Sequence, residues 1–375
     1  MCIKNELLNE LIKHDCIKIG NFRLKSGDMS KYYFDMKNLI SYPKLLSKVG
    51  DQLYKLMDMG YNDIICGVPM GGLPIASYIS TKYNIPMIIP REEQKGYGME
   101  KQIEGIYRKE SRCVIIEDVI TTGGSVQKII DLLEDKVTIT EVLVIVDRQH
   151  GYNCKYPLKP LFSKTDIVLR RLNNIITKKN SRLCFSGDLD NKENLLKMLE
   201  EIGDNIVICK LHLDMYEDDN DFKEKLLNLS INKDFLIMED RKFVDISYIV
   251  EKQYNKFRHI VDMVTVMATV SEDVIKKLSG VVIVANMSNN SWDFSEQAKI
   301  LANNTKEHVL GFVTQKRITM GDMICMTPGI SMIQKKVGDQ NYRKASYVDT
   351  DIIIVGRGIY NDPDYKKKAN EYSLV

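Results

Sequence analysis

Apolar runs alternate with amphipathic stretches along the first half of the chain. Four apolar runs, DIICGVP, PMIIPRE, RCVIIEDV and EVLVIVDR, are separated by amphipathic stretches such as SVQKIIDLLEDK. Short apolar runs of this kind are typical of buried parallel strands, and the amphipathic stretches are typical of the helices that cover them. The pattern predicts a doubly wound α/β domain over residues 1–175.

A second series of apolar runs follows a short connection. The apolar pattern weakens at NNIITKKNS, which contains no Pro-, Gly- or Ser-rich tether, so the two domains are expected to lie close together. Eight runs separated by helical patterns are the number that a (β/α)₈ barrel requires, so residues 181–375 are predicted to form a compact TIM barrel. The runs are LCFSGDL, IVICKLHL, FLIMEDR, MVTVMATV, VVIVANMS, VLGFVTQ, ICMTPG and IIIVGRG.

Polar residues or tight turns stand at the carboxyl ends of these predicted strands. Active sites of TIM barrels lie at this end, and phosphate is often bound by the loops after the seventh and eighth strands. The residues found there are Ser186, Asp188, Lys210, Asp214, Asp240, Lys242, Ser288, Thr327-Pro328-Gly329 and Gly356-Arg357-Gly358.

Charged residues of both signs gather at two neighbouring strand ends. Asp240 and Lys242 are two positions apart on a chain expected to be extended, so they share a face, and Lys210 ends the neighbouring strand. The spacing predicts an alternating array of lysines and aspartates in one cavity. Asp245 would turn into the same cavity or into that of a partner subunit. The alternative is a network of ion pairs at the rim, without a catalytic role.

Composition and charge narrow the classes of function. The chain has 44% hydrophobic and 28% charged residues and a net charge of +2, so no broad field favours nucleic acid or an anionic membrane, and the expected partners are small molecules. The opening MCIKNELLNELIKHD has the pattern of an amphipathic helix and not of a signal peptide, and no long apolar run follows, so a cytoplasmic location is expected. The eight cysteines form no CxxC pair, which argues against a zinc site and a disulfide framework.

The stretch EDRKFVDI resembles the DxKxxD signature of the orotidine 5′-monophosphate decarboxylase family. The similarity extends over LCFSGDL, CKLHLD, ANMS, MTPGI, GDQNYRK and DIIIVGRGI, and so covers the second domain. It implies a decarboxylation without metal or organic cofactor, in which Lys242 gives a proton to the ring carbon that loses carbon dioxide. Fixed charges suit this reaction because they need no reorganisation when a carbanion develops. The implied catalytic residues are Lys210, Asp240, Lys242 and Asp245, the last supplied by the other subunit of a dimer.

The same resemblance implies binding roles at other strand ends. Ser288 would bind the pyrimidine and Asp188 the ribose. The phosphate would be bound by Gln340, Tyr342 and Arg357. The implied substrate-binding residues of the second domain are Ser186, Asp188, Ser288, Pro328, Gln340, Tyr342, Gly356 and Arg357.

The first domain has a signature of its own in VIIEDVITTGGSV. An apolar strand ends in Glu117 and Asp118, and TTGGS then opens a helix, so backbone N–H groups and the helix dipole can bind a phosphate while the acids face ribose hydroxyls. The alternative is an ordinary strand-to-helix turn with a Ser cap. No Gly-Lys-Ser/Thr follows, so this is not a Walker loop.

This loop is similar to the ribose-phosphate loop of the type I phosphoribosyltransferases. FRLKSG, KYYFD, PREEQKGYG and VDRQHG narrow the resemblance to the orotate phosphoribosyltransferase family. It implies that Lys25 and Arg91 contact the diphosphate donor, that Lys95 lies on a mobile catalytic loop, and that Phe34 and Arg148 meet orotate. Mg²⁺ would be held mainly by the donor, with no firmly assigned protein ligand. The implied binding residues are Lys25, Tyr33, Phe34, Arg91, Glu117, Asp118, Thr121, Thr122, Gly123, Gly124, Ser125 and Arg148.

The two domains together resemble the bifunctional UMP synthase family. This implies de novo pyrimidine biosynthesis, with orotate, phosphoribosyl diphosphate and orotidine 5′-monophosphate as substrates, in a homodimer or higher homo-oligomer. Two departures leave alternatives open. Glu92 stands where the transferase family has a Lys, and Ile249 stands where the decarboxylase family has a Thr. The alternatives are a chain in which only the decarboxylase half is active, and a non-catalytic nucleotide-binding protein.

Overall fold

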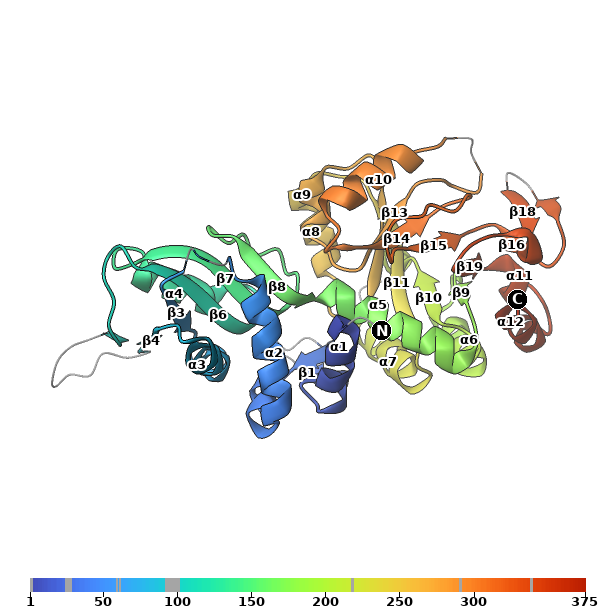
Figure 1. Ribbon diagram of the computed structural model, residues 1–375. Helices are drawn as coiled ribbons and strands as arrows, with labels where there is room; N and C mark the ends of the chain where they lie inside the picture. Colours follow the sequence, from blue (N-terminus) through green and yellow to red (C-terminus); the bar gives the residue numbers. More distant parts are fainter. Residues whose placement is uncertain are drawn as a thin grey trace. The chain divides into compact units, whose positions relative to one another are not determined.

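The computed structural model describes residues 3–23, 29–58, 60, 62–91, 102–216, 219–289, 292–337 and 340–375 (Figure 1). The chain divides into two compact units. The first comprises Met1–Lys18 and Tyr33–Lys164, and the second comprises Ile19–Tyr32 and Thr165–Val375. Among the helices of the described residues, none has both the length and the apolar character that crossing a membrane requires.

The first unit is built on a six-stranded sheet with the order β5-β4-β3-β6-β7-β8. The sheet is parallel, as predicted, except at its edge, where β5 pairs antiparallel with β4. Helix α4 packs on the face that contains Cys113 and Ile115, and α3 packs against β3 and β6. The strands are β3 (Ile64–Gly67), β4 (Met87–Pro90), β5 (Ile103–Glu104), β6 (Arg112–Ile120), β7 (Thr138–Asp147) and β8 (Leu158–Ser163). The helices are α1 (Ile3–Lys13), η1 (Met36–Ser41), α2 (Pro43–Leu56), α3 (Gly72–Tyr83) and α4 (Gly124–Leu133).

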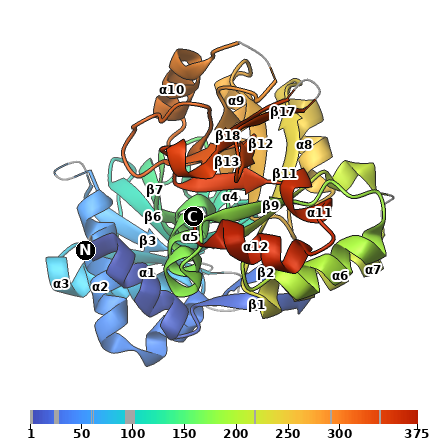
Figure 2. The ribbon, with the colours of Figure 1, turned by 90° about the vertical axis from the view of Figure 1, so that its right-hand side faces the viewer.

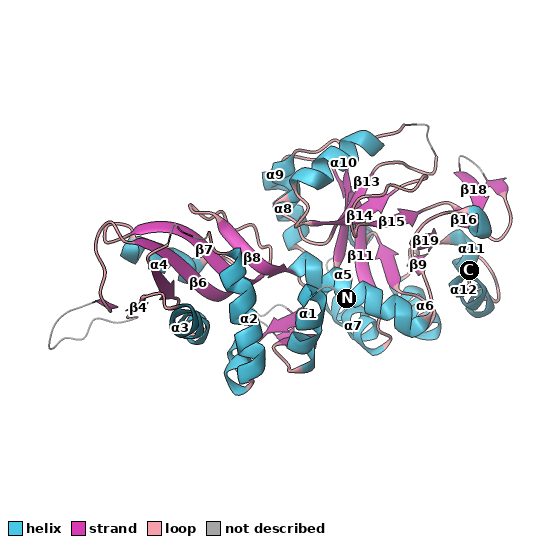
Figure 3. Cartoon of the chain, viewed as in Figure 1, coloured by secondary structure: helices cyan, strands magenta, loops and turns pink. Residues whose placement is uncertain are grey.

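The second unit contains the predicted closed barrel of eight parallel strands. Figure 3 shows these strands in magenta and the covering helices in cyan, and helices α6 and α12 are neighbours on the outside (Figure 2). The strands are β9 (Leu183–Ser186), β10 (Ile208–Leu211), β11 (Leu236–Phe243), β12 (Met263–Met267), β13 (Val281–Val284), β14 (Val309–Val313), β15 (Ile324–Thr327) and β19 (Ile352–Val355). The helices are α5 (Lys164–Lys179), α6 (Lys192–Ile202), η2 (Leu213–Met215), α7 (Asn220–Asn232), α8 (Ser247–Asn255), α9 (Glu272–Ile275), α10 (Ser295–Asn304), η3 (Ala345–Tyr347), α11 (Arg357–Tyr360) and α12 (Tyr365–Ser373).

A small three-stranded sheet is inserted between β15 and β19. Its order is β16-β18-β17, formed by β16 (Ile330–Ser331), β17 (Lys335–Val337) and β18 (Gln340–Lys344). Because it follows the seventh barrel strand, this sheet lies in the chain where TIM barrels commonly place phosphate-binding residues.

A two-stranded sheet from near the start of the chain contributes the least expected part of the barrel unit. It consists of β1 (Ile17–Arg23) and β2 (Met29–Phe34), and Ile19–Tyr32 cluster with the barrel. Lys31 and Asp262 are fully buried, and their Nζ and Oδ2 atoms are 2.6 Å apart. The Tyr32 hydroxyl donates a hydrogen bond to Asp262 Oδ1 at 2.6 Å, and Arg171 Nη1 lies 3.7 Å from the same oxygen. A buried charge cluster therefore joins this segment to the starts of the barrel strands.

Candidate active site

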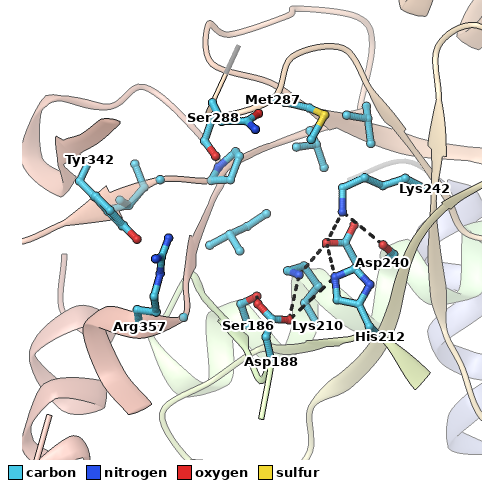
Figure 4. Close-up of a pocket in the computed structure, with 18 of the residues that line it drawn as sticks. Ser186, Asp188, Lys210, His212, Asp240, Lys242, Met287, Ser288, Tyr342 and Arg357 are labelled. Atoms are coloured by element: carbon cyan, nitrogen blue, oxygen red, sulfur yellow. Dashed lines mark hydrogen bonds and ion pairs between the residues drawn. The ribbon is translucent and has the colours of Figure 1, made fainter. Parts of the chain in front are cut away.

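The carboxyl ends of the barrel strands surround a cavity of about 470 Å³ (Figure 4). Two of the residues predicted for this domain are not among its lining residues. Asp245 is exposed, and its Oδ1 accepts a hydrogen bond from the Ile246 N–H at 2.7 Å. Gln340 begins β18, and its side chain lies outside the described part of the structure. The predicted residues that do line the cavity are Ser186, Asp188, Lys210, Asp240, Lys242, Ser288, Pro328, Tyr342, Gly356 and Arg357.

Asp240 is the centre of the charged array. Its Oδ2 lies 2.6 Å from Lys210 Nζ and 2.9 Å from Lys242 Nζ, and its Oδ1 accepts a hydrogen bond from the Thr265 hydroxyl at 2.8 Å. Burial alone would raise the pKa of Asp240, but the charges of Lys210 and Lys242 outweigh it and hold the pKa well below its usual range. Burial would likewise lower the pKa of Lys210, yet Asp240 and Asp188 raise it above its usual range. Both groups are therefore charged at neutral pH.

Lys242 reaches this cavity through an irregular backbone. Its φ is +53°, in the left-handed region that residues other than glycine seldom adopt, and the register between β11 and β12 shifts between Glu239 and Phe243. The Lys242 N–H donates to Thr265 Oγ1 at 3.0 Å, which holds this conformation in place. The prediction that Asp240 and Lys242 meet is confirmed by their distance, but a bulged strand brings them together, not an extended one. Strained backbone of this kind is concentrated at functional sites.

Asp188 and His212 extend the array along the cavity. Asp188 Oδ2 accepts a hydrogen bond from Ser186 Oγ at 2.8 Å, and Asp188 Oδ1 lies 3.5 Å from Lys210 Nζ. His212 lines the same cavity, although no role was predicted for it. Its position two residues after Lys210 could have indicated that it lies in the cavity, because this spacing places both side chains on one face of the chain. Thr265 was also missed, because a buried threonine within an apolar run gives no sign of a polar partner.

The opposite end of the cavity is suited to an anion. Figure 4 shows Arg357 and Tyr342 together and separated from the charged array by the width of the cavity. The Arg357 guanidinium carbon lies 5.8 Å from the centroid of the Tyr342 ring. Gly356 is close to Ser186, whose Cβ would be 3.1 Å from an added side chain. The apolar residues that line the cavity include Val284, Met287, Val313, Ile330 and Ile354. A ligand with an anionic group at the Arg357 end and a charged group at the end of the lysines and aspartates matches this distribution.

The predicted residues of the first unit gather at two places. Thr121 to Gly123 form the turn between β6 and α4, and Gly124 and Ser125 begin the helix; Gly123 has φ +75° and is the N-cap, without a side-chain cap hydrogen bond. The alternative of a Ser-capped turn is therefore wrong. Before this turn, burial and the neighbouring Asp118 raise the pKa of Glu117 to about 9. Gly123 also packs tightly, since an added Cβ would clash with the Tyr152 ring.

Phe34 and Arg148 form the second group of predicted residues in the first unit. The Arg148 guanidinium carbon lies 5.2 Å from the centroid of the Phe34 ring, so two residues distant in sequence are brought together. Tyr33 is exposed, and Arg91 forms an ion pair with Glu104. Three residues of the prediction, Lys25, Glu92 and Lys95, lie outside the described residues.

Comparison with known proteins gives two domain matches. Residues 181–372 match the orotidine 5′-phosphate decarboxylase / HUMPS family, and residues 35–164 match the phosphoribosyl transferase domain. Similar proteins of full length include the uridine 5′-monophosphate synthase of Naegleria gruberi, at 29% identity over 99% of this chain and 95% of the relative, and that of Bos taurus, at 29% identity over 98% and 95%. The orotate phosphoribosyltransferase of Methanosphaera stadtmanae is 42% identical over 40% of this chain and 84% of the relative.

Proposed function

The chain belongs to the orotidine 5′-phosphate decarboxylase / HUMPS family through residues 181–372, and we propose that it makes UMP from orotate in two consecutive reactions. The first joins orotate to phosphoribosyl diphosphate and gives orotidine 5′-monophosphate. The second removes carbon dioxide from that product and completes de novo pyrimidine biosynthesis. The observation that carries the proposal is the cluster of Lys210, Asp240 and Lys242 at one end of a cavity whose other end holds Arg357 and Tyr342.

The distribution of charge in the barrel suits decarboxylation. Arg357 would bind the phosphate, and Asp188 would accept hydrogen bonds from the ribose, which leaves the substrate carboxylate near Asp240. The bond between the ring carbon and the carboxylate breaks, its electron pair stays on the ring carbon, and carbon dioxide leaves. The Lys242 ammonium group then gives its proton to that carbon and regains one from solvent.

The protein lowers the barrier through charges that are already in place. The two ammonium groups at 2.6 and 2.9 Å from Asp240 favour a carbanion, and the ionised Asp240 disfavours the substrate carboxylate that lies beside it. Thr265 fixes Asp240 and the Lys242 backbone at once, so neither group has to move as the charge develops. We propose that this half needs no metal or organic cofactor.

The transferase half would use the turn after β6. The ring nitrogen of orotate loses its proton to solvent and forms a bond to the ribose carbon of phosphoribosyl diphosphate, and the diphosphate leaves with the electron pair of the broken C–O bond. The N–H groups at the start of α4 would bind the ribose phosphate, and Arg148 and Phe34 would hold orotate. Of the two acids before the turn, Asp118 would be the better ligand for Mg²⁺, because burial and the neighbouring Asp118 raise the pKa of Glu117. Mg²⁺ would be bound mainly by the donor and would offset the charge of the leaving diphosphate.

Replacing Lys95 with alanine is expected to lower the rate of orotidine 5′-monophosphate formation by about 10²-fold or more, since a positioned acid–base group contributes about 10²–10⁴-fold. Decarboxylation of added orotidine 5′-monophosphate should keep its rate. The measurement is the separate assay of each half-reaction with the purified full-length chain. The exposed Lys109, changed to alanine, is the matched control.

Two results of these assays would argue against the proposal. If Lys95→Ala lowered both rates equally, the two reactions would not use separate sites. If the unchanged chain made no orotidine 5′-monophosphate from orotate but decarboxylated orotidine 5′-monophosphate that was added, only the decarboxylase half would be active.

We also propose that the barrel acts as a homodimer in the cytoplasm. Asp245 is exposed, and large apolar side chains that are also exposed surround it in sequence, namely Val244, Ile246 and Tyr248. Such a cluster suits an interface, and in a twofold dimer the same patch meets itself, so each Asp245 can enter the other subunit's cavity.

Mixing inactive Lys242→Ala and Asp245→Ala chains is expected to restore decarboxylation. In a mixed dimer one site has both lysine and aspartate intact, so about a quarter of all sites recover if subunits exchange at random. The measurement is decarboxylase activity against mixing ratio, with subunit exchange shown by differently tagged chains. If exchange occurs and activity stays at the level of the single variants, the shared site is excluded.

A further inference from the structure

His212 lies in the barrel cavity between two carboxylates that the proposed decarboxylation uses. Its Nε2 is 3.5 Å from Asp240 Oδ2 and 3.9 Å from Asp188 Oδ1, and Figure 4 shows the ring directed at both. Its side chain is one of those that line the cavity, and it is 27% exposed. The mechanism above uses both aspartates but gives the imidazole no part.

Three nitrogen atoms surround one oxygen of Asp240. Lys210 and Lys242 lie 2.6 and 2.9 Å from Oδ2, and His212 lies farther away at 3.5 Å. A neutral imidazole at that distance interacts weakly, so the two ammonium groups hold the oxygen. An imidazolium would attract the same oxygen much more strongly because charge would be added to the hydrogen bond. It would then compete with Lys242, the proton donor.

The remaining charged groups around the ring come from neighbouring elements. A ring nitrogen of His212 and the carboxylates of Asp214 and Glu239 lie within 4.8 Å of one another. Asp214 is already paired with Arg241, and burial raises the pKa of Glu239 to about 8, so Glu239 is mostly protonated at neutral pH. The strongest fields on the imidazole are therefore those of the catalytic lysines and their two aspartates.

We propose that His212 is a positioning residue that acts through Asp240: as a neutral imidazole it leaves Asp240 to the two lysines, and its protonation stops turnover by drawing Asp240 away from Lys242. The inference rests on the decarboxylase function proposed above. A charged His212 would also offset the negative charge that Asp240 presents to the substrate carboxylate. Both effects act on the step in which the bond breaks.

The expected pH range follows from the surroundings of the ring. Burial, and then the charge of Lys210, lower the pKa of His212 below that of an ordinary histidine, although Asp240 opposes them. The imidazole is therefore neutral at pH 7 and gains a proton only on the acid side. Turnover should fall as the pH drops through this lowered pKa. Asp240 itself ionises at far lower pH and does not produce this fall.

The test compares the pH dependence of kcat for decarboxylation in the unchanged chain and in His212→Asn, at saturating substrate between pH 5 and 8. The unchanged chain should lose up to about tenfold in kcat per pH unit below the His212 pKa, since one proton is involved. His212→Asn should keep the kcat of the unchanged chain to within about tenfold at pH 7.5, because the neutral imidazole holds Asp240 only weakly, and its kcat should stay nearly constant toward acid pH. His14→Asn, in the other unit, should keep the profile of the unchanged chain.

A second variant and a direct titration complete the test. His212→Gln serves if His212→Asn does not fold, and an NMR titration of labelled histidine in the free protein should give His212 the same pKa as the acid limb of kcat/KM, which reports the free enzyme. The inference is overturned if the acid limb persists unchanged in a folded variant, as it would if the substrate phosphate or another group caused it. A complete lack of decarboxylation by the unchanged chain would instead overturn the proposed function.

Discussion

Replacing Lys242 with alanine is expected to lower the kcat of decarboxylation by about 10³-fold or more, because the variant loses both a proton donor and a fixed charge beside the developing carbanion. Interactions that strengthen only as the charge develops act on turnover and not on the binding of substrate. KM should therefore change much less than kcat. The measurement is steady-state decarboxylation of orotidine 5′-monophosphate.

The matched comparison is Arg357→Ala at the other end of the cavity. Arg357 lies beside Tyr342 and far from the bond that breaks, so its loss should raise KM chiefly, with a smaller fall in kcat. Both variants need a check of folding. If Lys242→Ala kept near-normal turnover, the lysines and aspartates would be an ion-pair network at the rim, and the proposed mechanism would be wrong.

The architecture of the barrel was predictable because its signal is repeated. Each of the eight apolar runs forms a barrel strand. Such strands are buried on both sides, and a short continuous apolar run is therefore their typical sequence pattern. The same eight runs also located the ends of the strands, and the residues at these ends line most of the cavity. Asp240, Lys242 and Lys210 could be placed together from spacing alone.

The details that hold those charges in place were beyond the sequence pattern. The left-handed backbone of Lys242 depends on a bulge and on the Thr265 hydroxyl, and Thr265 reads as an ordinary member of an apolar strand. His212 had no predicted role, because nothing along the chain reports its distance to Asp240. Such contacts depend on tertiary distances between strands, which no spacing along one strand reports.

The sequence pattern also gave no sign of where residues 19–32 belong. Lys31 stands in KYYFD, among polar and aromatic residues that resemble a substrate-binding segment, and nothing marks it as a core residue. Its burial depends on Asp262, more than 200 positions later in the chain, and on the Phe235 carbonyl, which accepts a hydrogen bond from its Nζ at 3.2 Å. A lysine becomes a core residue only when such partners converge on it.

Lys31→Met is therefore expected to lower the free energy of unfolding of the barrel unit by about 3 kcal/mol, the lower end of the range for removing one partner of a buried ion pair. The lower end applies because Asp262 keeps other partners, namely the Tyr32 hydroxyl, the Ile237 N–H at 2.8 Å and the more distant Arg171. The methionine fills most of the space that the lysine stem occupied, so the loss reports the charge and not a cavity. The measurement is urea unfolding followed by decarboxylase activity and by the fluorescence of Trp292, the single tryptophan of the chain, which lies in this unit.

Two further variants isolate the ion pair. Lys299→Met removes a lysine that pairs with Glu296 on the surface of the same unit, and its unfolding midpoint should stay within the error of that of the unchanged chain. The double variant Lys31→Met, Asp262→Asn should be less destabilised than the sum of the single variants by about 1 kcal/mol or more, because each single change strands a charge that the double change removes. If the effects were simply additive, Lys31 and Asp262 would act independently. The segment 19–32 would then be held to the barrel by packing and backbone hydrogen bonds, and not by the charge pair at its base.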